Sequence, residues 1–196
     1  MEAGQCLAAR KTGHHVGLDG ERLLMEGRRD GLWENRVVPD EAPILEVSVR
    51  VLLIDGQDRL LLFLFKSDDG DVWMTPGGAI LEGESPEEAV PRVRWEQSGV
   101  GDIDVGPCVW LRTHLYPWDG KVYKQQDRFY PVVVEEAEIT DEYWDDVEKR
   151  VLADFKWWSL DEINASDAFF SPVSLHKLLP PIIAGDYPSE PIATGA

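Results

Sequence analysis

The order of hydrophobic and polar positions divides the chain into strands, one well-marked helix and further strands. From Ile44 to about Leu53, apolar residues alternate with polar ones, which is typical of a half-buried strand. The apolar run 60–65 has the character of a central strand. A turn at 55–57 separates the two segments, so we expect them to pair.

A glycine-rich loop and a capped helix follow. Ser85 suits the N-cap of this helix, Pro86 its first position, and Glu88 the carboxylate position of a capping box. Gly99 suits the left-handed residue that ends a helix. Pro91 lies past the first turn and removes one backbone hydrogen bond, so we expect the helix to be kinked or locally frayed there.

The rest of the chain predicts four strands and two helices. The expected strands are 72–75, which leads into the glycines, then 105–115 and 122–134 around an Asp-Gly hairpin turn, and a final aromatic-rich strand at 155–158. Ser159 is expected to cap a short helix. A second helix is expected to start at Ser171-Pro172 and to end at Pro180-Pro181.

The loop and first helix resemble the box of the Nudix family. That box reads Gly, five residues, Glu, seven residues, Arg-Glu, an aliphatic residue, any residue, Glu-Glu, any residue, Gly and an aliphatic residue. The residues that fall on this spacing without a gap are Gly78, Glu84, Arg92, Glu96, Gly99 and Val100. The resemblance implies an α/β class and a Nudix-like α/β/α sandwich with a mixed β-sheet.

The chain departs from the box where the family's chemistry is located. Val93 stands where the family has the Glu after the Arg, Arg94 replaces the aliphatic residue, and Gln97 replaces the last Glu. In the family these three glutamates hold a divalent metal against a substrate diphosphate. Only Glu96 remains, so a tightly bound metal cluster is not expected.

The resemblance implies roles for the retained residues. Glu96 would bind the metal, and Arg92 would orient Glu96 or another carboxylate. Gly78 would contribute its backbone carbonyl near the metal. Glu84 and Gly99 would shape the box. Mg²⁺ is often held by one or two carboxylates, with substrate phosphates and water completing its shell. We therefore expect weak or substrate-assisted binding of Mg²⁺ or Mn²⁺.

Further carboxylates could complete the site. Asp127 shares a strand face with Gln125, and it is either a substitute ligand or base or an exposed carboxylate beside Arg128. An acidic block follows at 135–148, where family members often supply another metal-binding carboxylate, so Asp141 and Glu142 are candidates. The alternative for this block is a solvated surface.

Two functions remain open. The first is hydrolysis of a diphosphate linkage in a substrate of the nucleoside diphosphate-X type. The second is a catalytically inactive Nudix-fold module that binds a nucleotide or a protein. A nucleotide or nucleotide-sugar ligand fits both, and candidates to stack on a base are Trp73, Trp110, Tyr116 and Trp118, although aromatics on strands are usually core.

Composition limits the partners. The 196 residues suit one domain, which we place at residues 41–182, between an N-terminal extension (residues 1–40) and a disordered tail (residues 183–196). The formal charge of −18 opposes binding to nucleic acid. The chain has no apolar run long enough to span a membrane, so we expect a cytoplasmic protein. A homodimer is left open.

Overall fold

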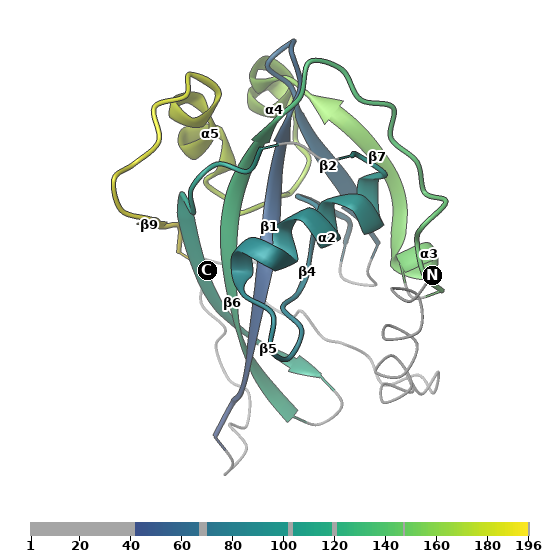
Figure 1. Cartoon of the computed structure of the whole chain (residues 1–196), viewed down its shortest axis with the longest axis vertical. Coiled ribbons are helices and arrows are strands. Elements are labelled where there is room, and N and C mark those ends of the chain that lie inside the picture. The colour runs from purple at the N-terminus through teal and green to yellow at the C-terminus, as the bar shows by residue number, and fades with distance from the viewer. Residues whose placement is uncertain (1–41, 67–69, 102–103, 119–120, 147, 196) are drawn as a thin grey trace.

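The computed structural model describes residues 42–66, 70–101, 104–118, 121–146 and 148–195. Within them a nine-stranded sheet carries helices on both faces (Figure 1). The N-terminal extension expected at 1–40 lies outside the described residues. The strands are β1 (Ile44–Ile54), β2 (Leu60–Phe65), β3 (Val72–Met74), β4 (Gly77–Ala79), β5 (Trp110–Trp118), β6 (Lys121–Val133), β7 (Leu152–Trp158), β8 (Phe170–Ser171) and β9 (Ile192–Ala193). The helices are α2 (Pro86–Ser98), α3 (Glu148–Val151), α4 (Leu160–Ala165) and α5 (Leu175–Ile183).

The sheet is mixed and β1 is its central strand. Its order is β8-β3-β2-β1-β6-β5-β9, with β4 also paired to β1 and β7 to β2. β1 runs parallel to β6 along its whole length and antiparallel to β2 and β4. The alternation at 44–53 and the apolar run at 60–65 are thus confirmed as two paired strands.

Each face of the sheet has its own hydrophobic core. Odd positions of β1 such as Val49 and Val51 pack with Val90 and Val93 of α2. Even positions such as Leu52 pack with residues of α4 and α5 on the other face. Figure 1 shows α2 lying across β1 and β6. These layers form the expected α/β/α sandwich, and they put positions 48 and 50 of β1 on the side away from α2.

Several expected boundaries are corrected. β5 begins at Trp110 rather than Val105, which makes only an isolated bridge to Val132. The Asp-Gly turn lies outside the described residues, but Trp118 and Lys121 pair on either side of it, as a hairpin requires. β7 begins at Leu152, and two short strands follow it.

The C-terminal part is more ordered than expected. α5 begins after Ser174 and continues through Pro180-Pro181 to Ile183, because burial of Leu179 and Ile182 offsets the backbone hydrogen bonds that the prolines remove. Residues 183–196 were expected to be disordered, yet Ile192–Ala193 forms β9. The Ile192 N–H donates to the carbonyl of Val109 at 2.9 Å and so attaches this segment to β5.

Candidate functional site

The diglycine segment and α2 form the expected loop-helix unit. The Ser85 hydroxyl accepts a hydrogen bond from the Glu88 backbone N–H, and the Glu88 carboxylate accepts one from the Ser85 backbone N–H, which completes the capping box. Gly99 ends the helix with a φ of 71°, in the left-handed region. The helix runs unbroken past Pro91, so the expected fraying is wrong. Burial of Val90 on the core side holds this turn in place.

Arg92 joins the two box glutamates that the chain retains. Its Nε and Nη2 donate to Glu84 at 2.8 and 2.7 Å, and its Nη1 donates to Glu96 at 3.0 Å. Nη2 also donates to the carbonyl of Ala79 next to the glycines. The hydrogen bonds from Arg92 lower the pKa of Glu84. Arg92 therefore fixes the Glu96 carboxylate, whose side chain is 26% exposed, beside the diglycine strand.

Val93 occupies the position of a family glutamate as a core residue. It is 1% exposed and packs in the cluster between α2 and the sheet. A Cβ atom built on Gly78 would lie 3.0 Å from a Val93 methyl group, so β4 approaches the helix closely at this point. An aliphatic contact between α2 and β4 therefore lies at the position where the box resemblance implies a glutamate.

Gln97 occupies the second altered position and ties three segments together. Its Oε1 accepts the Gly77 N–H at 2.7 Å, and its Nε2 donates to Oε1 of Glu148 at 2.9 Å. The other Glu148 oxygen accepts the Asp145 N–H at 2.8 Å. Gln97, the residue after Glu96 in α2, thus binds the carboxylate of Glu148 at the start of α3.

The acidic block lies against α2, but through different residues from those expected. Tyr143 stacks on Trp95 with ring centroids 5.0 Å apart, and Trp144 donates its indole N–H to the carbonyl of Gln97. Asp141 and Glu142 are exposed, and in the described part of the chain no hydrogen bond or ion pair joins their carboxylates to α2. Glu148 is the carboxylate of this block that contacts the box.

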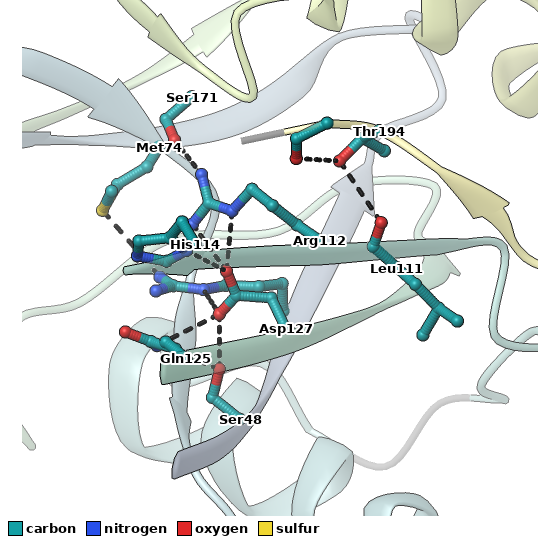
Figure 2. Close-up of polar contacts among 11 residues, drawn as sticks. Ser48, Met74, Leu111, Arg112, His114, Gln125, Asp127, Ser171 and Thr194 are labelled. Carbon is teal, nitrogen blue, oxygen red and sulfur yellow. Dashed lines mark hydrogen bonds and ion pairs between the residues drawn. The ribbon is translucent and has the colours of Figure 1, made fainter. Parts of the chain in front are cut away.

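Asp127 belongs to a buried polar network on the other face of the sheet (Figure 2). Its side chain is 0% exposed, so the exposed alternative beside Arg128 is wrong. One carboxylate oxygen accepts hydrogen bonds from Arg50 Nε at 3.0 Å and from the Ser48 hydroxyl. The other accepts from Arg112 Nε at 2.7 Å.

Neighbouring groups complete this network. Gln125 donates to Asp127 at 3.1 Å, which confirms that the two share a face. The Nδ1 atom of His114 lies 3.8 Å from Asp127, and Arg112 also donates to the hydroxyl of Ser171. The structure thus brings Asp127 together with arginines; in the segments it describes, no direct contact joins Asp127 to Glu96.

The ionisation of the network follows from its charges. Burial alone would raise the pKa of Asp127, but Arg50 and Arg112 outweigh it and hold that pKa below its usual value. Burial, and then the charge of Arg112, lower the pKa of His114 to about 4. The network therefore contains two guanidinium cations, one carboxylate and a neutral imidazole at neutral pH.

The residues present do not form a preloaded metal cluster. In the described part of the chain, no three His, Cys, Asp or Glu side chains gather closely enough to hold a metal ion. The candidate donors on and against α2 are the Glu96 carboxylate and the Glu148 carboxylate that Gln97 binds. This set fits Mg²⁺ or Mn²⁺ only if a ligand supplies further oxygens.

Two of the four aromatic residues considered for stacking on a base pack against other aromatic side chains. Trp110 is fully buried and packs on Phe129, while Trp73 packs edge-on against Trp158. For Tyr116 and Trp118 the structure describes the backbone but not the side chains. Trp110 is therefore a core residue, in agreement with the alternative that an aromatic residue on a strand packs in the core.

A family model described as the NUDIX domain matches residues 45–178, a range that includes strands β2 to β8, nearly all of β1, the box helix and the start of α5. The chain belongs to the Nudix family. A comparison with curated proteins gives no match. No helix of the described Nudix chain has the length and apolar character needed to cross a bilayer.

Solved structures share the fold at low sequence identity. A MutT protein from Methanosarcina mazei Go1 matches with a TM-score of 0.53 and 19% identity, over 70% of this chain and 91% of that one. The E. coli dihydroneopterin triphosphate pyrophosphohydrolase matches with a TM-score of 0.54 and 17% identity, over 72% and 99%. The Nudix domain of Shewanella oneidensis NrtR, complexed with ADP ribose, matches with 0.52 and 19%, over 70% and 86%.

Sequence reasoning found the box but missed two groups of residues. Glu148 was hidden within the acidic block, and only its spacing from Asp145, typical of a helix N-terminus, distinguished it. Arg50 and Arg112 were missed although each continues a period-two polar pattern, on β1 and β5, that faces Asp127. That pattern on three adjacent strands was the available signal.

Proposed function

We propose that this Nudix protein hydrolyses a diphosphate linkage in a substrate of the nucleoside diphosphate-X type, with a divalent cation held jointly by the protein and the substrate phosphates. The observation that carries the proposal is the placement of Glu96. Its carboxylate is partly exposed and is bound by Arg92, which also donates to the Ala79 carbonyl of the diglycine strand. Arg92 with Glu84 and Glu96 carries one net negative charge, which favours a cation.

Each residue of the box has a distinct part in this proposal. Glu96 supplies the carboxylate ligand, and Arg92, clamped by Glu84, positions it. Glu148, held by Gln97, supplies a second carboxylate and is better placed than Glu142 because it contacts α2 directly. When bound, Mg²⁺ or Mn²⁺ neutralises charge that develops on phosphate oxygens during water attack.

The substrate class is supported by two related structures. One is the structure of a dihydroneopterin triphosphate pyrophosphohydrolase, and the other is that of a Nudix domain complexed with ADP ribose. Both compounds contain linked phosphates, although at this identity the likeness itself extends only to the fold. Nucleotide sugars, ADP-ribose and nucleoside triphosphates therefore form the panel to be tested.

A second candidate is a Nudix module that binds such a ligand without turning it over. Val93 favours it, because its burial removes one family carboxylate completely. Gln97 also favours it, because both ends of its amide are engaged in holding Gly77 and Glu148. A low rate and the absence of turnover are the two outcomes that separate the candidates.

The test compares wild type with Glu96→Gln. With Mg²⁺ or Mn²⁺, wild type should release monophosphate or phosphate from a member of the panel, and Glu96→Gln should lower that rate by about 100-fold or more. Glu136→Gln is the matched control, because it removes an exposed carboxylate from the acidic block and should leave the rate unchanged.

Two results would contradict hydrolysis. The first is wild type with no turnover of any substrate, accompanied by an increase in melting temperature when the same compounds are added, which supports the binding module. The second is an equal rate for wild type and Glu96→Gln, which would remove Glu96 from the proposal.

A further inference from the structure

The Asp127 network contains more positive charge than its own carboxylate neutralises. Arg50 and Arg112 share Asp127 as their ion-pair partner, and their side chains are 12% and 7% exposed. Desolvating a guanidinium is unfavourable unless a partner compensates its charge. One of the two positive charges therefore has no full counter-charge within the network, and it lies on a sheet face in a protein whose formal charge is −18.

Arg50 is the arginine with donors to spare. Its Nε binds Asp127, whereas its Nη1 faces the sulfur of Met74 at 3.8 Å, a weak acceptor. No further contact is described for its Nη2 within the segments that the structure describes. Arg112, by contrast, uses Nε and Nη2 on Asp127 and Nη1 on Ser171. The outer edge of the Arg50 guanidinium is thus the part of the network able to accept an anion.

The backbone of β4 places this guanidinium beside the box. Arg50 pairs with Gly77 across the β1–β4 ladder. A Cβ atom on Gly77 would overlap Cδ of Arg50 and come within 2.8 Å of the Val49 carbonyl oxygen, so only glycine permits this approach. Gly78 meets Val93 on the opposite side. The diglycine strand therefore separates Arg50 from α2 by a single layer of backbone.

We propose that Arg50, supported by Arg112 and Asp127, forms a binding site for a phosphate group of an anionic ligand on the face of the sheet opposite α2. The planar guanidinium fork matches the spacing of phosphate oxygens, and a phosphate supplies the missing counter-charge. His114, Gln125 and Met74 border the site and are only partly buried, which leaves it open to a small ligand. That the anion is a phosphate rests on the proposed function; the surplus of positive charge does not.

The test is a calorimetric titration with inorganic pyrophosphate in EDTA, so that no metal at Glu96 contributes. Wild type should bind, and Arg50→Gln should weaken binding at least about tenfold. Arg128→Gln is the matched control, because Arg128 lies one position beyond Asp127 on β6, is exposed and faces the other side of the sheet. It should change the dissociation constant less than about twofold.

Further measurements protect the test against a folding defect. Arg50→Lys keeps a positive charge beside Asp127 but loses the fork, so it should still unfold cooperatively as a folded protein and bind at least about threefold more weakly. In unaltered wild type, saturating pyrophosphate should raise the His114 pKa above its value of about 4, followed by NMR of the imidazole. Both readouts are independent of catalysis.

Three outcomes would overturn the site. They are no pyrophosphate binding by wild type, equal binding by wild type and Arg50→Gln, or equal affinity for succinate, which would show a site for carboxylates. None of them affects the Glu96 proposal, and loss of hydrolysis in Glu96→Gln leaves metal-free pyrophosphate binding intact. Failure of one proposal is thus distinguishable from failure of the other.

Discussion

Two ion-pair networks flank the diglycine strand with opposite stoichiometry. On the α2 side, one arginine, Arg92, binds two carboxylates, and all three side chains are partly exposed. On the other side, one carboxylate, Asp127, binds two arginines, and all three are buried or nearly so. The first network carries a net negative charge and the second a net positive one, so each favours a ligand of opposite sign.

The difference in burial gives the two networks different structural weight. Exposed ion pairs contribute little to stability, because water solvates and screens their charges. A buried pair is costly to break, because the remaining charge stays in a medium of low dielectric constant. The Asp127 network should therefore dominate stability, whereas the Arg92 network should matter mainly for ligands.

The largest expected effect is that of Asp127→Asn. It leaves Arg50 and Arg112 buried without a counter-charge, and it should lower the free energy of unfolding by about 3 to 5 kcal/mol. Urea denaturation measures this change. The exposed Glu136→Gln should alter it by less than about 0.5 kcal/mol. A loss below about 1 kcal/mol for Asp127→Asn would show that the two networks do not differ in this way.

A smaller effect is expected from the titration of His114. Its pKa is about 4 in the folded protein, against an ordinary 6.5, so between these values the unfolded chain binds the proton more readily. The stability that His114 contributes is thus complete above pH 6.5 and is lost as the pH falls toward 4. At pH 4.5 the loss should be about 2 kcal/mol, reduced by partial exposure.

The measurement is the free energy of unfolding of wild type and His114→Gln at pH 7 and pH 4.5. The variant should lose less stability between the two pH values, because it lacks the imidazole, whereas the carboxylates titrate equally in both proteins. The pKa of Asp127 is lowered, so its contribution persists in this window and declines only at more acidic pH. Identical pH dependence in the two proteins would contradict the positive environment of His114.

The smallest expected effect concerns the α2 side of the diglycine strand, where Gln97 binds Glu148. Gln97→Glu would place a carboxylate against Glu148, where the amide now donates at 2.9 Å, and should lower stability by about 1 to 2 kcal/mol without metal. Mg²⁺ should then raise the melting temperature of the variant more than that of wild type. Gln126→Glu on β6 should show no such metal dependence; if both variants respond alike, Glu148 is not part of a cation site.

The architecture was readable from sequence where local rules agree with packing. Ser85, Glu88 and Gly99 each determine a backbone hydrogen bond close in sequence, so the helix limits were predicted correctly. The fraying expected at Pro91 and the helix end expected at Pro180-Pro181 are both wrong, because propensity describes an isolated helix. Tertiary burial of the neighbouring apolar residues overrides it here.

The site was only partly readable, because its second half depends on pairing between distant strands. The box spacing identified Glu84, Arg92 and Glu96, and the structure shows that Arg92 forms ion pairs with both glutamates. The position of Asp127 against Arg50 depends on the parallel register of β1 with β6, 77 residues apart in sequence. Strand register over such separations cannot be deduced from local patterns, so the sequence does not predict the environment of Asp127.

The absence of side chains on the two glycines of β4 affects how the sequence of this protein can change during evolution. Gly77 lies against Arg50 and Gly78 lies against Val93, so a single strand of backbone separates the two regions. Substitutions at position 93 can therefore alter the α2 side without touching Arg50, and substitutions around Arg50 can alter anion preference without disturbing the helix. Gln97 is coupled to both sides, because it accepts the N–H of Gly77, which packs against Arg50. Descendants of this chain could change ligand and chemistry in separate steps, provided both glycines are kept.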